Sequence, residues 1–190
     1  MFLIAGLGNP DKEYEGNRHN VGFMAVDSLV HRYNFAPFKN RFNALVSEGN
    51  IDGKKVIAVK PLTYMNNSGQ AVRAAMDFYK MSVSELFVIH DDMDLPFAKV
   101  KAKIGGGAGG HNGLRSIDAH CTSAYTRLRI GIGRPESKDQ VVNFVLSDFS
   151  KAQKKDLEVL FDEIGEALPV LLSEGTGGFL NRLALIQHKN

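Results

Sequence analysis

Five polar residues of this sequence are of types that could together hydrolyse an ester: His19, Asp91, Asn9, Asn66 and Asn112. Histidine is the side chain whose unperturbed pKa suits proton transfer near neutral pH. A carboxylate can hold its tautomer and stabilise the imidazolium, and such a pair can activate water without a covalent nucleophile, a gain of about 10²–10⁴ in rate. Asparagine amides both donate and accept, so three of them could bind peptide amides and a developing oxyanion.

Each of these residues also has a purely structural interpretation. Asn9 precedes Pro10, as in a common Asx turn. Asn66 and Asn112 each precede an expected helix and could be simple N-caps. Taken one at a time, these interpretations are at least as good as the catalytic one. Together with a basic segment and a glycine-rich loop, however, the set is better explained as a site for an ester carried by a nucleic acid.

Positive charge is concentrated in one part of the chain. The formal net charge is only +2, but residues 95–134 hold 7 basic side chains against 1 acidic one, a net +6. The rest of the chain holds 16 basic against 20 acidic side chains, a net −4. A nearly neutral protein with one strongly basic segment is suited to binding a polyanion. The alternative is a solvated basic face of a strand.

A metal site is the strongest competing chemistry. Imidazole and carboxylate ligands could come from His19, His90, Asp91, Asp92, Asp94 and His111. No HExxH motif or helical histidine pair fixes their spacing, and contiguous acids after a strand are often turn and cap residues. We therefore expect no functional metal.

Two glycine motifs indicate nucleotide binding only weakly. Gly6 and Gly8 follow an apolar run, but Asp11 occupies the place of the third glycine of a dinucleotide fingerprint. Residues 105–110, the glycine loop, include 5 glycines, but His111 stands where a phosphate loop needs lysine. A phosphate-binding metabolic enzyme built on this loop stays open as an alternative.

The elements that must position these residues follow from hydrophobic periodicity and turn signals. We expect strands over about 2–8, 44–48, 55–60, 86–89, 98–104 and 127–133, and helices over about 18–33, 67–80, 113–120 and much of the last forty residues, with a break at Gly177-Gly178. Asp52-Gly53 predicts a hairpin turn. Alternation predicts one cationic strand face with Lys99, Lys101 and Lys103, and outward charges at Arg127 and Arg129.

Strands interleaved with helices predict one α/β domain over residues 1–190, a twisted mixed β-sheet with helices on both faces. The first strand begins without a basic region ahead of it, unlike a signal peptide, and no apolar run approaches the roughly 18 residues of a membrane span. The lone Cys121 forms no internal disulfide, which suits the reducing cytosol, and it lacks an adjacent base. We therefore expect a cytoplasmic protein.

Several blocks of the sequence closely resemble the bacterial peptidyl-tRNA hydrolase family in order and spacing. They span most of the chain: residues 6–10 (GLGNP) followed by Tyr14, 18–20 (RHN), 61–69 (PLTYMNNSG), 90–96 (HDDMDLP), 105–113 (GGGAGGHNG) and 127–133 (RLRIGIG). The resemblance implies an enzyme that hydrolyses the ester between an N-blocked peptide and the 3′ end of tRNA. The fold it implies is again a twisted mixed sheet between helices.

The resemblance also implies a role for particular residues. His19 matches the catalytic base, Asp91 its supporting carboxylate, and Asn9 the residue that distinguishes N-blocked from free aminoacyl esters. The remaining matches are substrate-binding, with the cleft lined by Tyr14, Tyr64, Met65, Asn66 and Asn112, and with tRNA phosphates bound by Lys101, Lys103 and Arg129. No metal or organic cofactor is implied, nor any membrane, and the protein is expected to be a monomer. A non-catalytic RNA-binding paralogue of the same fold is the alternative function.

Overall fold

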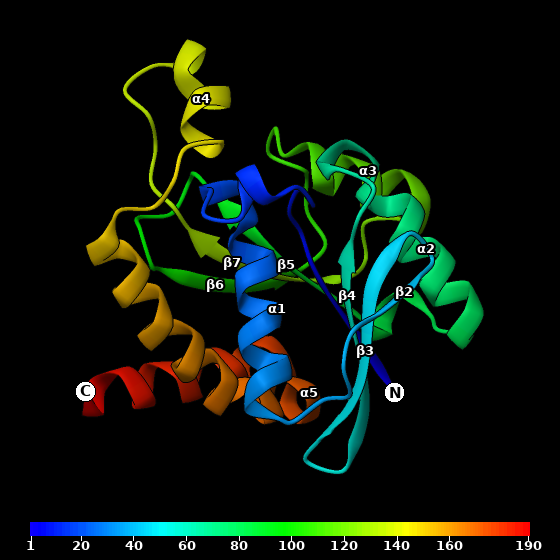
Figure 1. Cartoon of the computed structure of the whole chain (residues 1–190). Coiled ribbons are helices and arrows are strands. Elements are labelled where there is room, and N and C mark those ends of the chain that lie inside the picture. Colours follow the sequence, from blue (N-terminus) through cyan, green and yellow to red (C-terminus); the bar gives the residue numbers. More distant parts are fainter.

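The computed structural model describes residues 1–190 and is built around one mixed sheet (Figure 1). Its strands, in chain order, are β1 (Phe2–Gly6), β2 (Lys39–Arg41), β3 (Ala44–Ile51), β4 (Lys54–Pro61), β5 (Leu86–Asp92), β6 (Val100–Ile104) and β7 (Thr126–Gly131). Across the sheet the order is β2-β3-β4-β1-β5-β7-β6. The four central strands are parallel, and an antiparallel strand or hairpin completes each edge. This confirms the predicted fold class.

The central strands are buried on both faces, which explains their continuous apolar runs. In β1, Ile4 belongs to one hydrophobic core while Leu3 and Ala5 belong to the other. The β3–β4 hairpin turns where the sequence predicted, because Asp52 and Gly53 take the positive φ angles of 51° and 79° that a tight hairpin turn requires.

Helices form a layer on each face of the sheet (Figure 1). The helices are α1 (Val21–Arg32), α2 (Ser68–Tyr79), α3 (Asn112–Cys121), α4 (Val141–Val145) and α5 (Lys151–Lys189). The larger core joins α1 and α5 to one face, and the smaller core joins α2 and α3 to the other. α4 is set apart from both layers in Figure 1, although Phe144 and Val145 pack against the larger core. None of the helices has the length and apolar character that crossing a bilayer requires.

Some boundaries differ from those predicted. The strand expected to end at residue 89 continues through Asp92, because its polar end is buried with hydrogen-bond partners. The short elements β2 and α4 had no periodic signal long enough to predict them. The break in the C-terminal helix lies at Gly175, which has a φ of 82°, so the predicted break at Gly177-Gly178 is wrong.

The prediction that Arg127 points outward is also wrong. Its side chain is only 1% exposed. The guanidinium donates to the carbonyl oxygens of Gly106 and Gly107 at 2.8 and 2.6 Å, and it forms an ion pair with Asp118 at 3.2 Å. Strand alternation placed this residue on the solvent side, but these oxygen partners offset the cost of burying its charge.

The parallel arrangement determines where the chemistry lies. β1, β4 and β5 are neighbouring parallel strands, so their C-terminal ends meet at one edge of the sheet. The order reverses at β1, and such a switch point is where open α/β sheets bind ligands. Asn9 follows β1, Met65 and Asn66 follow β4, and Asp91 lies at the end of β5.

Candidate active site

A cavity of about 850 Å³ opens at this edge of the sheet. Nine of the eleven predicted site residues line it: Asn9, His19, Tyr64, Met65, Asn66, Asp91, Lys103, Asn112 and Arg129. Tyr14 and Lys101 are not among the lining residues. The fold therefore brings together one imidazole, one carboxylate and three asparagine amides from segments far apart in the sequence.

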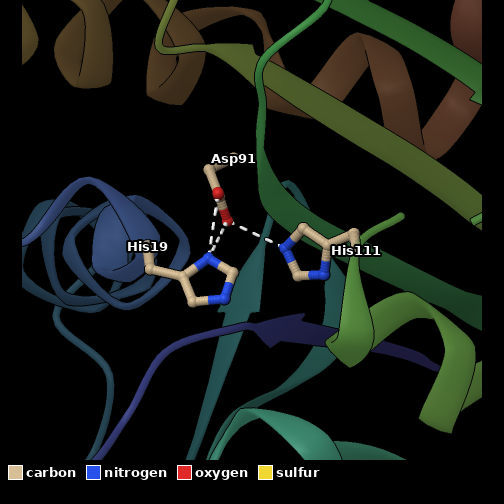
Figure 2. A group of neighbouring side chains, drawn as sticks. All are labelled: His19, Asp91 and His111. Atoms are coloured by element: carbon tan, nitrogen blue, oxygen red, sulfur yellow. Dashed lines mark hydrogen bonds and ion pairs between the residues drawn. The ribbon is translucent and has the colours of Figure 1, made fainter. Parts of the chain in front are cut away.

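Asp91 is held between two histidines (Figure 2). His19 Nδ1 lies 2.9 Å from Asp91 Oδ2 and 3.1 Å from Oδ1, and His111 Nε2 lies 2.8 Å from Oδ1. Asp91 is 3% exposed, whereas both rings reach the cavity. One buried carboxylate thus orients two imidazoles beside the cavity.

Backbone contacts fix the tautomer of His111. Its Nδ1 accepts hydrogen bonds from the backbone N–H groups of Gly113 and Leu114, at 3.1 and 3.3 Å, and so caps α3. A nitrogen that accepts cannot carry the proton, so in the neutral ring Nε2 carries it and donates to Asp91. His19 Nδ1 likewise donates to Asp91, which leaves His19 Nε2 as a proton acceptor.

Asp91 stays ionised despite its burial. Burial alone would raise the pKa of this carboxyl, but the positive potential and hydrogen bonds of His111 and His19 outweigh it and hold the pKa well below its usual range. Neighbouring His90 behaves differently. Burial, assisted by His111, lowers the pKa of His90 to about 4, and its Nδ1 donates to the Asp91 backbone carbonyl at 2.8 Å.

The same geometry disfavours a metal at this cluster. His19, Asp91 and His111 have ligand atoms within 4.8 Å of one another, as a metal site would need. A neutral histidine that binds a metal through Nε2 carries its proton on Nδ1. In His111 that proton would point at the two backbone N–H groups of α3. Metal binding would therefore break the helix cap, and the cluster is better suited to proton transfer.

Asn9 is held rigidly, with one group left for a ligand. Its backbone exchanges two hydrogen bonds with the Asn20 side chain, at 2.8 and 2.9 Å. Its side-chain oxygen accepts from the backbone N–H of Met65 at 2.9 Å. The Asx-turn interpretation is therefore wrong, because the side chain bonds a distant segment. The amide nitrogen of Asn9 remains as a donor at the cavity.

Asn66 and Asn112 are exposed at the cavity, and neither caps a helix. The N-cap of α3 is His111, and that of α2 is Asn67, whose side chain makes no capping bond. The Asn112 side chain instead accepts from Arg115 at 3.3 Å. Both amides are thus available to a ligand.

The two predicted tyrosines lie differently. Tyr64 is half exposed at the cavity, has a φ of 59° and donates to Asp11 at 2.5 Å. That hydrogen bond, with burial and charge in support, raises the pKa of Tyr64. Tyr14 is partly buried beside this pair, outside the cavity lining. The carboxylate of Asp11 thus holds the Tyr64 ring at the cavity.

The basic residues around the cavity differ in how free their charges are. Lys101 and Lys103 are exposed on β6, as the alternation predicted. Arg129, opposite Lys101 on β7, donates to Asp92 at 2.7 Å, so its charge is already paired. Lys101 and Lys103 form no ion pair, so their positive charges stay free on this face.

The glycine loop is not a phosphate cradle. Its first half is tied down through the bonds of Arg127 to Gly106 and Gly107. In the helix that follows, the N–H groups of Gly113 and Leu114 are occupied by His111 Nδ1. A phosphate at a helix N-terminus would bind those N–H groups. The structure therefore disfavours a nucleotide-binding enzyme built on this loop.

Sequence reasoning missed three features of this site. The role of His111 at Asp91 was missed, although its place just before Asn112-Gly113 marks a helix start. Asn20, which positions Asn9, follows His19 directly. An apolar wall from α4 and its end was not predicted at all, and it consists of Val141, Val142, Val145 and Leu146.

Cys121 is buried, and burial raises the pKa of its thiol to about 11, in line with a non-catalytic residue.

Comparisons with known proteins agree with this geometry. The family model described as peptidyl-tRNA hydrolase matches residues 3–190. A peptidyl-tRNA hydrolase of Rhizobium rhizogenes is 51% identical over 185 residues, which cover 97% of this chain and 78% of that protein. One of Parvibaculum lavamentivorans is 50% identical over 97% of this chain and 91% of its own. The crystal structure of peptidyl-tRNA hydrolase from Acinetobacter baumannii matches with a TM-score of 0.91 and 37% identity, over 96% of this chain and 94% of that one.

Proposed function

The chain belongs to the peptidyl-tRNA hydrolase family and hydrolyses the ester of peptidyl-tRNA, and we propose that it does so with His19 as the general base. The observation that carries this proposal is the Asp91 carboxylate, which bonds Nδ1 of His19 and leaves Nε2 free in a cavity that three asparagines also line. The remaining residues then take roles that follow from their contacts.

In the proposed reaction, His19 Nε2 takes a proton from a water molecule as the oxygen attacks the ester carbonyl carbon. Asp91 stabilises the imidazolium that forms, and His111 keeps Asp91 in place through its Nε2–H. The asparagine amides donate to the oxyanion of the tetrahedral intermediate. Its collapse breaks the bond to the ribose oxygen, which takes the proton from His19. The products are a free tRNA 3′ end and a peptide carboxylic acid, which releases its remaining proton to solvent and leaves as the carboxylate.

Asn9 accounts for selectivity toward N-blocked esters. Because its oxygen is occupied by the Met65 N–H, it presents its amide N–H groups to the cavity. A blocked amino group brings a carbonyl oxygen that can accept from them. A free aminoacyl ester brings an ammonium group, which only donates, and leaving that charge unpaired costs several kcal/mol, on the order of the penalty for a buried polar group or ion.

The tRNA is held from the basic side of the cavity. Lys103 lines the cavity and Lys101 extends the same exposed face, so both are placed to contact phosphates near the acceptor end. Arg129 joins them if the phosphate displaces Asp92. Tyr64, Met65, Asn66 and Asn112 contact the ester and the 3′ nucleotide, and Tyr14 supports the Tyr64 side of the cavity.

The remaining expectations form part of the same proposal. The enzyme works in the cytoplasm as a monomer, with no metal or organic cofactor and no membrane partner. A non-catalytic RNA-binding paralogue is disfavoured, because such a protein would have no use for a histidine bonded to a buried carboxylate at the cavity.

The test is release of the acyl group from N-acetyl-aminoacyl-tRNA compared with the unacetylated ester of the same tRNA. Rapid release from the acetylated ester, with little from the free one, is the expected result. Equal rates for the two esters would contradict the role of Asn9, and tight tRNA binding without release would support the paralogue.

A further inference from the structure

The apolar wall of the cavity is only partly packed against the rest of the fold. α4 contains no buried residue, and Val142 is 65% exposed. Its helix, α4, is set apart from both helix layers (Figure 1). Phe144 and Val145 are only partly buried where they pack against the larger core. Burial of its own side chains therefore holds α4 only in part, and polar contacts add to it.

Arg18 provides that contact. Its Nη1 donates to the backbone oxygens of Ser147 and Asp148 and to the Ser147 hydroxyl, at 3.2, 2.9 and 2.7 Å. Its guanidinium also stacks 4.6 Å from the centre of the Phe144 ring and 5.5 Å from that of Phe149. One side chain thus fastens the end of α4 and the segment that follows it.

The backbone beside Arg18 joins the same segment. The Arg18 N–H donates to the Ser147 oxygen at 3.0 Å, and the Asn17 side chain donates to Asp148 at 2.7 Å. His19 is the next residue along the chain, and Asp91 holds its ring. The residue that fastens the wall therefore adjoins the proposed base.

We propose that Arg18 is a positioning residue that holds the α4 wall against the cavity beside His19 and so sets how tightly the cavity binds peptidyl-tRNA. The inference rests on the proposed function. Loss of the wall removes contacts made equally in the ground and transition states, so it raises KM more than it lowers kcat. The bond between His19 and Asp91 does not involve Arg18, so proton transfer is preserved.

The variant Arg18→Ala tests this. The lost hydrogen bonds and cation–π contact predict a rise in KM of about 10- to 100-fold, with kcat within about threefold of the parent. Hydrogen exchange at residues 141–149 should become faster. Millimolar guanidinium should lower KM again by refilling the vacated site. Arg18→Lys, which keeps the charge but cannot bond all three oxygens, should fall between the parent and Arg18→Ala.

The matched control is Arg32→Ala. Arg32 also stacks on an aromatic ring, Tyr33, and donates to a backbone oxygen, that of Asp162, but it ties α1 to α5 away from the cavity. This variant should keep the parent KM. An equal rise in KM for Arg32→Ala would overturn the proposal. So would an Arg18→Ala variant whose KM and hydrogen-exchange rates match those of the parent.

Two further measurements keep the test decisive. If Arg18→Ala does not fold, Ser147→Ala removes one acceptor and should raise KM in the same direction by a smaller factor, and parent KM would count against the proposal. Exchange at residues 141–149 needs no substrate. If the parent fails to release acyl groups, the proposed function fails, while faster exchange in Arg18→Ala still supports the attachment of the wall.

Discussion

At the scale of single residues, the site depends on which atom of each side chain is already occupied. Asp91 was foreseeable from the sequence, because an acidic cluster follows a buried strand, and so was a histidine as its partner. The second histidine that bonds Asp91 could not be predicted. His111 is 20 residues further along, and no periodicity shows that its Nε2 reaches Asp91 while its Nδ1 caps α3. Such roles need coordinates, because they depend on the direction of individual ring nitrogens.

A pair of substitutions separates the two functions of His111. Asparagine is a good N-cap, so His111→Asn should keep the cap of α3 but lose the bond to Asp91, whereas His111→Leu loses both. We expect both variants to lower kcat by about 10- to 100-fold, the value of a hydrogen bond to a charged group. Only the leucine variant should lose a further ~1 kcal/mol of stability in urea unfolding. Full kcat in the asparagine variant would show that Asp91 does not need His111.

At the scale of elements, sequence patterns predicted the structure correctly where it depends on neighbouring residues. They failed where it depends on partners far away in the sequence. The hairpin at Asp52-Gly53 follows from the positive φ angles that those residues tolerate. The exposure of Lys101 and Lys103 follows from alternation along an edge strand. The same alternation predicts that Arg127 is exposed, but it is buried. Its partners, Asp118 and two loop carbonyls, cannot be recognised from a local pattern.

The basic face of β6 and β7 makes a prediction about salt. Lys101→Ala and Lys103→Ala should each weaken tRNA binding and reduce the slope of log Kobs against log salt by about 0.7–0.9, as expected for one lost phosphate contact. Kd is measured by fluorescence anisotropy at several salt concentrations. Lys155→Ala, exposed on α5, is the control and should leave the slope unchanged. Unchanged slopes in both β6 variants would refute a phosphate contact by this face.

At the scale of the whole molecule, the sheet order brings together residues that the chain keeps far apart. A single domain with a mixed sheet could be predicted from alternating strands and helices. The convergence of Asn9, Asn66 and Asp91 then follows from the parallel direction of β1, β4 and β5. The attachment of α4 could not be predicted, because a five-residue helix is too short to show a period and because the contacts of Arg18 that help hold it join segments about 130 residues apart.

Burial at the end of β5 predicts how stability varies with pH. The folded protein keeps His90 neutral down to about pH 4, whereas the unfolded chain takes up a proton near the ordinary value of 6.5. The contribution of neutral His90 to the free energy of unfolding is therefore fully present above about pH 6.5. It falls as the pH drops toward 4, and the loss is about 2 kcal/mol at pH 5. The depressed pKa of Asp91 adds a further loss only at lower pH.

Urea unfolding at several pH values checks this. His90→Asn keeps a donor for the Asp91 carbonyl but cannot titrate, so its stability should fall less steeply between about pH 6.5 and pH 5 than that of the parent. His31→Asn, at an exposed position of α1, should keep the parent slope. An identical slope in His90→Asn and the parent would show that His90 is not the group responsible.

The most direct test of the account compares turnover and tRNA binding in His19→Ala. Single-turnover release from N-acetyl-aminoacyl-tRNA should fall by about 10²–10⁴, because the base is gone, while Kd for the tRNA stays within about twofold of the parent. The exposed His31→Ala should match the parent in both measurements. Retained turnover in His19→Ala, or a loss of binding with turnover intact, would contradict the role assigned to this imidazole.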